Sequence, residues 1–264
     1  MRQKKQRLDT LVHERGLAAT RSKAQGLIMA GEVMVNGVVV DKSGTKLGSD
    51  VVITVKQRPP YVSRGGEKLA GALSDFSLDV TNCISADVGA STGGFTDCLL
   101  QNGVARVYAI DVGYGQLAHK IRVDERVIVI ERTNARYLEI LNEPVNLVVV
   151  DASFISLKLL LPAIQKWLCP QADIVALIKP QFEAGKSDVS KGGVVKDSKI
   201  HARVIQDIAE FTLSLNFSVM GLTMSPIKGA KEGNTEFLIW LQHGKPTQNP
   251  IDFITSIETI LVSE

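Results

Sequence analysis

One segment constrains the fold of this chain more than any other. The run Asp87-Val-Gly-Ala-Ser-Thr-Gly-Gly-Phe95 follows an apolar stretch at 84–88 and precedes a stretch near 95–102 with the apolar spacing of a helix. Glycines between a strand and a helix let the backbone approach a ligand because no Cβ stands in the way. The segment therefore predicts an α/β sheet that binds a ligand at the carboxyl ends of its strands.

Further apolar segments recur along the chain and are separated by amphipathic stretches: residues 106–111, 127–130, 145–151, 172–179 and 237–241. Strands that alternate with helices favour a Rossmann-like, mostly parallel sheet with helices on both faces. Polar or glycine residues stand where four of the predicted strands end, the one at 84–88 included, namely Gly89, Asp111, Asp151 and Lys179. We expect these residues at one edge of the sheet.

The glycine loop narrows the choice of ligand. It is not a phosphate cradle of the Walker type, because no Gly-Lys-Ser/Thr ends it, and its second glycine comes too late for the dinucleotide fingerprint. A wider loop suits a ligand without a pyrophosphate, and S-adenosylmethionine is the common candidate. Asp111, at the end of the second strand, is placed to accept hydrogen bonds from ribose hydroxyls. The alternative, a loop rich in glycine only for helix–sheet packing, does not explain Asp111.

Cysteine use and hydropathy exclude several classes of protein. The three cysteines Cys83, Cys98 and Cys169 are far apart and form no CxxC pair, so we expect neither a disulfide framework nor a metal site. No apolar run approaches the ~20 residues that span a bilayer, and the basic first residues lead into no apolar signal-peptide core. We expect a cytoplasmic protein.

Charge is unevenly distributed. Residues 1–68 hold 13 Lys/Arg and 6 Asp/Glu, whereas the remainder holds 17 and 22, so a basic front end precedes a mildly acidic body. A basic segment joined to an acidic body suggests a nucleic-acid-binding module. The excess of positive charge in residues 1–68, considered by itself, is explained equally well by an ordinary solvent-exposed surface.

The basic front end also has a recognisable pattern of elements. Leu8, Leu11 and Val12 have helical spacing before Gly16, and Thr20 can cap a second helix that stops at Gly31. Residues 32–40 then read as two strands joined by the tight turn Asn36-Gly37, and 51–55 as another strand. The pattern predicts two helices on a small sheet, a compact α+β unit.

This unit resembles the small alpha-L, or S4-like, RNA-binding domain, on the segments Arg7-Leu-Asp, Thr20-Arg-Ser-Lys-Ala and Gly31-Glu-Val-Met-Val-Asn-Gly37. The resemblance implies that basic side chains contact RNA, and our candidates are Arg7, Arg15, Arg21, Lys23 and, just beyond the unit, Arg64. Each of them taken singly is as readily an ordinary surface charge.

The adjacent Pro59 and Pro60 can continue neither a strand nor a helix. We therefore divide the chain into an RNA-binding domain at 1–57, a linker at 58–62, a cofactor domain at 63–244 and a tail at 245–264.

Four charged residues are candidates for catalysis: Lys68, Asp151, Lys179 and Glu236. Asp151 and Lys179 each end an apolar strand, and Glu236 precedes one. Alkylation of a ribose hydroxyl needs a positioned oxygen and help with its proton, and a lysine amine can serve as that base where burial or a second cation lowers its pKa. Each residue singly is more readily a structural ion pair, whereas the four together favour catalysis.

The order Lys68, Asp151, Lys179, Glu236 resembles the Lys-Asp-Lys-Glu tetrad of FtsJ-type RNA ribose 2′-O-methyltransferases. The chain is more narrowly similar to the TlyA family, also called hemolysin-like. That similarity rests on Ser63-Arg-Gly-Gly-Glu-Lys-Leu69, the 87–97 loop, Asp111-Val-Gly-Tyr-Gly-Gln-Leu117, Glu131-Arg-Thr-Asn134, Asp151-Ala-Ser-Phe-Ile-Ser156 and Ile178-Lys-Pro-Gln-Phe-Glu183. The loop has Ser91-Thr92 where the wider FtsJ group usually has a proline, a form that is typical of the narrower family.

The resemblance implies methylation of the 2′-hydroxyl of cytidine in ribosomal RNA of one or both subunits, with S-adenosylmethionine as cofactor and no metal. It implies that Lys179 takes or steers the hydroxyl proton, that Asp151 and Lys68 set its charge state, and that Glu236 orients the group. The cofactor-binding residues would be Gly89, Ala90, Ser91, Thr92, Gly93, Gly94, Phe95, Asp111, Val112, Asn134 and Asp151.

Other interpretations stay open at this point. A membrane-active hemolysin would need a span or an exported amphipathic helix, and a non-catalytic ribosome-assembly factor would not need the four-residue set. A pseudouridine synthase can carry the same front end, but the body here has a cofactor loop.

The polar, glycine-rich composition of residues 183–193 predicts either a mobile loop or a merely disordered one. The apolar spacing of the tail predicts a helix that packs either on the body or on a second copy in a homodimer.

Overall fold

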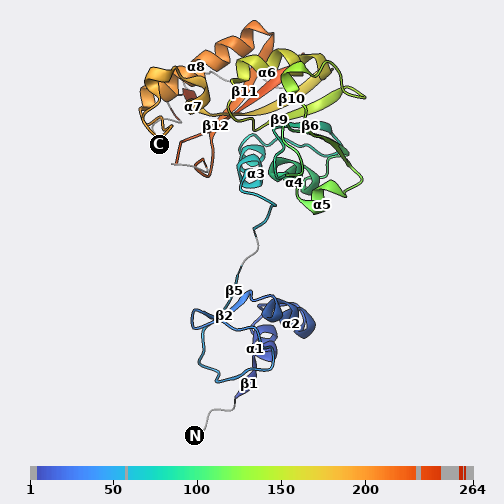
Figure 1. The fold of residues 1–264 in the computed structure, drawn as a ribbon, viewed down its shortest axis with the longest axis vertical. Helices are drawn as coiled ribbons and strands as arrows, with labels where there is room; N and C mark the ends of the chain where they lie inside the picture. Colours follow the sequence, from blue (N-terminus) through green and yellow to red (C-terminus); the bar gives the residue numbers. More distant parts are fainter. Residues whose placement is uncertain (1–4, 57–58, 230–232, 245–255, 258, 260–264) are drawn as a thin grey trace. The chain divides into compact units, whose positions relative to one another are not determined.

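The computed structural model describes residues 5–56, 59–229, 233–244, 256–257 and 259. The chain divides into two compact units, Met1–Pro59 and Pro60–Glu264 (Figure 1). The first unit has one hydrophobic core, and the second unit has two, one on each face of its sheet.

The first unit confirms the two helices, the hairpin and the following strand expected from its sequence, and it adds two short strands that were not predicted. Its elements are β1 (Gln6–Arg7), α1 (Leu8–Glu14), α2 (Arg21–Met29), β2 (Val33–Val35), β3 (Val38–Val39), β4 (Lys46–Leu47) and β5 (Ile53–Val55). The Thr20 side chain accepts a hydrogen bond from the backbone N–H of Lys23 and so caps α2. Asn36 and Gly37 both have positive φ, at 51° and 80°, as a tight hairpin turn between β2 and β3 requires.

The second unit is built on a seven-stranded sheet with the strand order β11-β12-β10-β9-β6-β7-β8. Its strands are β6 (Ile84–Val88), β7 (Arg106–Ile110), β8 (Val127–Ile130), β9 (Val145–Val150), β10 (Leu168–Ile178), β11 (Phe217–Met224) and β12 (Phe237–His243). Strands β6 to β10 pair in parallel, and β12 runs antiparallel to both β10 and β11. The strand order reverses between β6 and β9, where an open α/β sheet leaves a crevice for a ligand.

Helices cover both faces of this sheet, as predicted (Figure 1). One face carries α3 (Gly65–Asp75), α4 (Gly94–Gln101) and the short α5 (His119–Arg122); the other carries α6 (Leu157–Ile164) and α8 (Ser198–Ser214). The remaining short elements are α7 (Pro180–Glu183) and the 3-10 turns η1 (Ala135–Tyr137), η2 (Gln165–Trp167) and η3 (Lys186–Asp188). Alternate residues of the strands enter the two cores, for example Val148 and Val149 of β9.

Some elements differ from the expectations. Strand β11 was not predicted, and β10 begins at Leu168 rather than at 172, with a register shift before Asp173. The segment predicted as a mobile loop at 183–193 includes η3 and a turn in which Ser190 donates to the carbonyl of Val194. Most of the predicted tail lies outside the described residues, but Ile257 is helical and is buried against the core on the α6–α8 face.

The described part of the chain was expected to lack a membrane span and a metal site, and two findings bear on its composition of helices and side chains. It contains no helix that combines the length and the apolar character needed to cross a bilayer. It also contains no group of three or more His, Cys, Asp or Glu side chains that could hold a metal ion.

Candidate active site

The glycine loop lies at the carboxyl end of β6 and packs closely on the end of β9. Gly89 has φ +87°, and a Cβ built on it would stand 2.7 Å from the backbone oxygen of Asp151. Gly93 has φ +94°, and its missing Cβ would meet the side chain of Leu117 at 2.9 Å. Both positions therefore require glycine, one to bring the loop against Asp151 and the other to start α4.

Asp111 ties this loop to the next one. Its Oδ2 accepts a hydrogen bond of 2.8 Å from the backbone N–H of Ser91, and its Oδ1 accepts one of 2.6 Å from that of Gly113. The carboxylate therefore holds the loops after β6 and β7 together at the edge of the sheet. A carboxylate has about four acceptor positions, so Asp111 keeps capacity for a ligand.

Two adjoining cavities, each of about 920 Å³, open beside the loop. The first, named the cofactor cavity after the ligand expected from the sequence, is lined by Asp111, Val112 and Asn134 together with apolar residues such as Ile110, Ile155 and Leu160. The second, the reaction cavity, is lined by all four candidate catalytic residues. The two cavities share a wall formed by Gly89, Ser91, Asp151, Ser153, Phe154, Gln181 and Phe182.

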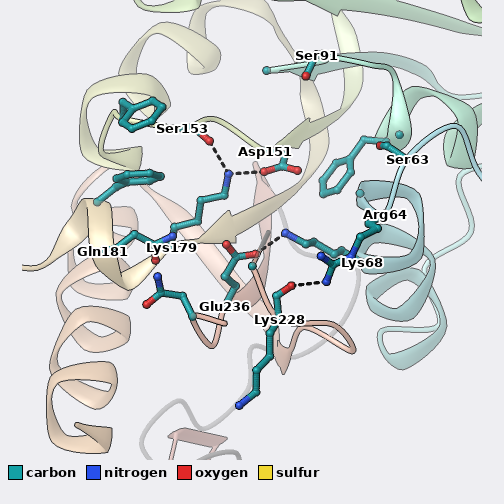
Figure 2. Close-up of a pocket in the computed structure, with 18 of the residues that line it drawn as sticks. Ser63, Arg64, Lys68, Ser91, Asp151, Ser153, Lys179, Gln181, Lys228 and Glu236 are labelled. Carbon is teal, nitrogen blue, oxygen red and sulfur yellow. Dashed lines mark hydrogen bonds and ion pairs between the residues drawn. The ribbon is translucent and has the colours of Figure 1, made fainter. Parts of the chain in front are cut away.

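The four catalytic candidates form two ion pairs in the reaction cavity (Figure 2). Lys179 Nζ lies 2.5 Å from Asp151 Oδ1 and donates to Ser153 Oγ at 3.0 Å. Lys68, on α3, pairs with Glu236, which directly precedes β12. The two amines and the two carboxylates balance in formal charge. Lys68, Lys179 and Glu236 are all buried, and buried charges are tolerated where they are paired.

Two aromatic residues face each other on the shared wall. Phe154 is 90% exposed and has φ +64°, and its ring lies 5.0 Å from that of Phe182. A bulky residue at positive φ is a strained backbone conformation, and such strain is concentrated at functional sites. Lys179 Nζ lies 6.0 Å from the Phe182 ring. The exposed Phe154 ring, which packs on Phe182 next to this lysine, provides an apolar face on which a planar group can stack.

Glu183 holds this wall in place. Its Oε2 accepts a hydrogen bond of 2.6 Å from the Ser156 hydroxyl, and its Oε1 accepts one of 2.8 Å from the backbone N–H of Leu157. It therefore joins the end of α7 to the start of α6, so that the Asp151–Phe154 loop is anchored to the element after Lys179. Burial raises the pKa of Glu183.

Asn234 organises another part of the lining of the reaction cavity. Its Oδ1 accepts from the backbone N–H of Val195 at 3.0 Å, and its Nδ2 donates to the carbonyl oxygen of Gly193 at 2.9 Å. Gly192 and Gly193 line the reaction cavity. Asn234 thus fastens the 189–195 segment to the strand end that carries Glu236.

Asp87 lies beneath the glycine loop and is fully buried. Thr96 Oγ1 donates to its Oδ2 at 2.6 Å, whereas its Oδ1 has no hydrogen-bond partner in the part of the chain that the structure describes. Burial raises the pKa of Asp87 to about 7, with Asp151 and Asp111 adding to the increase. Near neutral pH this carboxyl is therefore partly protonated.

We expect Asp87→Asn to remove a pH dependence of stability. The folded-state pKa of about 7 exceeds the ordinary value of 3.8, so the folded chain holds a proton that the unfolded chain has lost. The free energy of unfolding should then fall as pH rises from about 4 to about 7, by up to about 1.4 kcal/mol per pH unit, and stay level above. The variant should lack this fall and be the more stable protein at pH 8.

Urea unfolding at pH 5 and pH 8 measures this difference. Asp207→Asn, at an exposed position of α8, is the matched control and should show the wild-type fall in the free energy of unfolding between pH 5 and pH 8. If the free energy of unfolding falls equally in both variants, Asp87 is ionised in the folded protein.

The other residues predicted from the sequence are placed as follows. Ala90, Thr92, Gly94, Phe95 and Arg64 line the reaction cavity, whereas Gly93 lines neither cavity. Arg64 donates to the backbone oxygen of Lys228 at 2.7 Å. Arg7, Arg15, Arg21 and Lys23 all lie in the first unit; Arg15 donates to the backbone oxygens of Val51 and Ser49 and so has part of its donor capacity taken.

Several cavity residues were not predicted from the sequence: Ser153, Phe154, Gln181, Phe182, Lys228 and Asn234. Phe154 and Phe182 each stand in a segment that had been singled out for a neighbouring charge. Nothing in the pattern distinguishes an exposed aromatic ring from a buried one, so only the structure identifies them.

Comparison with known proteins assigns the chain to a family. The model of the FtsJ-like methyltransferase family matches residues 61–243, and that of the S4 domain matches residues 6–53. The chain is 50% identical to "Putative rRNA methyltransferase YqxC" of Bacillus subtilis, over 91% of this chain and 87% of that protein. It is 45% identical to the 16S/23S rRNA (cytidine-2′-O)-methyltransferase TlyA of Mycobacterium tuberculosis, over 89% of each.

A solved structure, "Putative hemolysin from Streptococcus thermophilus", superposes with a TM-score of 0.74 at 44% identity, covering 98% of this chain and 95% of that one. These matches extend over both units. The chain therefore belongs to the FtsJ-like methyltransferase family, within the group that includes TlyA, and has an S4 domain in its first unit.

Proposed function

We propose that this protein transfers a methyl group from S-adenosylmethionine to the ribose 2′-hydroxyl of cytidine in ribosomal RNA. The observation that carries the proposal is the reaction cavity, in which two paired lysines and two carboxylates adjoin a second cavity suited to the cofactor. The relatives named as rRNA (cytidine-2′-O)-methyltransferases support the choice of cytidine and of ribosomal RNA.

The cofactor cavity fits S-adenosylmethionine. Gly89 lines this cavity and brings its loop against the end of β9, Asp111 retains acceptor capacity for ribose hydroxyls, and Val112 and Ala152 offer apolar contacts. Gly89, Ser91 and Asp151 line both cavities and would hold the cofactor where the two meet. When bound, the cofactor supplies an electrophilic methyl group on a sulfonium sulfur.

The side chains of the reaction cavity would position the hydroxyl and handle its proton. Lys179 Nζ points into this cavity (Figure 2) and would take or steer the proton that the hydroxyl loses. Asp151, 2.5 Å away, would stabilise the ammonium that forms when the neutral amine takes the proton, and Ser153 fixes the direction of the amine. The Lys68–Glu236 pair would orient the ribose, because both side chains are held within the same cavity.

The S4 domain supports an RNA partner. Two small-subunit ribosomal proteins uS4 also match 26% of this chain, at 33–34% identity. Phosphate contacts from such a module position an enzyme on RNA without selecting a base. With ribosomal RNA as substrate, the enzyme would act in the cytoplasm.

One experiment tests the proposal. The protein is incubated with methyl-labelled S-adenosylmethionine and with unmodified small and large ribosomal subunits or their free RNA, and the labelled nucleotide is mapped. Label on the 2′-oxygen of a cytidine is the expected result. Binding to the particles without methyl transfer would instead favour an assembly factor, and lysis of washed erythrocytes by the purified protein would favour the membrane-active alternative.

We expect Phe154→Ala to lower kcat/KM for RNA by about 10- to 100-fold, because stacking on an aromatic ring contributes about 1–3 kcal/mol per base. The side chain is 90% exposed, so thermal stability should stay within about 0.5 kcal/mol of wild type. Phe154→Tyr, which keeps the ring, should retain activity. Leu213→Ala, at an exposed position of α8, is the control for loss of an exposed apolar side chain. A Phe154→Ala enzyme as active as that control would exclude a stacking role.

A further inference from the structure

The first unit contains a fully buried carboxylate, Asp9, near the start of α1. Charged side chains are almost never fully buried unless they are paired. Asp9 accepts hydrogen bonds from Arg7, Arg21, Gln25 and the backbone N–H of Thr10. It is therefore the centre of a small polar cluster in the first unit, with Arg7, Arg21 and Gln25 around it.

Two arginines converge on this one carboxylate. Arg7 binds it in a bidentate fashion, with Nε 3.0 Å from Oδ1 and Nη2 2.9 Å from Oδ2, while Arg21 Nη2 lies 3.2 Å from Oδ2. Gln25 Nε2 donates to Oδ2 at 2.8 Å. The Arg7 guanidinium holds the pKa of Asp9 well below its usual range, so the carboxylate stays charged at neutral pH.

Both arginines keep a free side. Their side chains are 45% and 51% exposed although they are paired. A guanidinium has five N–H donors, and Asp9 takes two from Arg7 and one from Arg21. Two positive charges against one negative charge leave a net positive charge at this point. Fixed guanidinium donors of this kind match the oxygens of a phosphate.

We propose that Asp9 is a positioning residue, which holds Arg7 and Arg21 side by side as a preorganised site for a backbone phosphate of RNA. The inference rests on the RNA partner proposed above and adds the phosphate site and the residue that builds it. Asp9 itself would not touch the RNA, since it has no exposed surface.

This role has an unusual consequence. Removing a negative charge from a basic RNA-binding surface should by simple electrostatics strengthen binding. If Asp9 positions the arginines, its removal weakens binding instead, because each freed arginine must be ordered again when RNA binds. The direction of the change therefore distinguishes positioning from charge alone.

The test compares Asp9→Asn with Asp41→Asn in the full-length protein. Both substitutions remove one negative charge from the same unit, but Asp41 is exposed. Affinity is measured by filter binding to unmodified 23S and 16S rRNA transcripts of Bacillus subtilis, over a range of salt concentrations. We expect Asp9→Asn to bind about tenfold more weakly, with a salt slope smaller by about one phosphate contact, and Asp41→Asn to bind at least as tightly as wild type.

A second background separates positioning from a general loss of structure. Asp9→Asn is also introduced into the Arg7→Ala/Arg21→Ala protein, and circular dichroism sets the binding temperature below the melting point of every variant. Positioning requires the effect of Asp9→Asn on affinity to disappear in that background. An undiminished loss there, or an Asp9→Asn protein that binds as tightly as Asp41→Asn, would overturn the inference. A wild-type protein that binds neither transcript would overturn the RNA partner, and the inference with it.

Discussion

Replacing Lys179 by alanine is expected to abolish detectable methyl transfer to ribosomal RNA while binding of S-adenosylmethionine persists. Lys179 Nζ is the one lysine amine of the reaction cavity that contacts both Asp151 and Ser153 among the described residues. Loss of a positioned proton-transfer group lowers rates by about 10²–10⁴-fold. The residue does not line the cofactor cavity, so the cofactor Kd should change by less than about threefold, since only an interaction specific to the reaction is lost.

The measurements are single-turnover transfer of labelled methyl groups and calorimetric titration of the cofactor. Lys179→Met keeps the apolar stem and removes the amine, so it should be as inactive as alanine but better folded. Lys199→Ala, at an exposed position in the first turn of α8, is the control and should be fully active. Full activity of Lys179→Ala would refute the assignment of this residue, whatever the other variants show.

The sequence predicted the parallel part of the sheet well because its strands are apolar runs with polar residues at their carboxyl ends. Asp111 and Asp151 each directly follow the last strand residue, so the edge of the sheet could be located from the pattern. Strand β11 escaped prediction for a physical reason. Gly221 interrupts its apolar pattern, the register with β12 shifts between Val219 and Gly221, and the ring of Phe76 packs where a Cβ would otherwise stand.

The candidate site was predictable in its members but not in its pairing. The order of the charged residues identified Lys68, Asp151, Lys179 and Glu236 as one set of candidates. It did not show which of them pair, and Lys68 and Glu236, which do pair, are 168 positions apart in the chain. Which lysine pairs with which carboxylate depends on where α3 lies against the sheet. The position of α3 is decided by the packing of residues such as Leu69 and Leu73 in the core on the α3–α4 face of the sheet. Packing partners of this kind leave no trace in local spacing.

Helix α8 was not predicted either, although its sequence contains the features that indicate a helix. Asp197 caps its N-terminus by accepting a hydrogen bond from the backbone N–H of Lys199. Val204, Ile205, Ile208 and Thr212 are buried at helical spacing. A capping acid followed by an apolar stripe is a sequence-level indication of a helix. Tertiary context was therefore needed for β11 and for the ion pairs, but not for this element.

Gly89→Ala is expected to have the largest effect on stability and to weaken cofactor binding as well. A residue with a Cβ at φ +87° is strained by about 1–2 kcal/mol. The new Cβ would also stand 2.7 Å from the backbone oxygen of Asp151, and relieving such an overlap costs about 1–3 kcal/mol because backbone has to move. Displacing either the loop or the end of β9 disturbs the wall that both cavities share, so we expect the Kd for S-adenosylmethionine to rise at least about tenfold, or about 1.4 kcal/mol.

Gly103→Ala separates strain from overlap, because Gly103 has a similar φ of +80° but its Cβ would meet only Thr81, at ordinary contact distances of 3.6 Å and more. Urea unfolding should show the strain in both variants and the overlap only in Gly89→Ala, which would then be the less stable by about 1–3 kcal/mol. Calorimetry should show wild-type cofactor affinity for Gly103→Ala. If the two alanine variants are equally stable and bind the cofactor equally well, the close approach of Gly89 to Asp151 does not shape the site. A cofactor defect confined to Gly89→Ala would instead tie cofactor affinity to the single point where the loop after β6 rests on the end of β9.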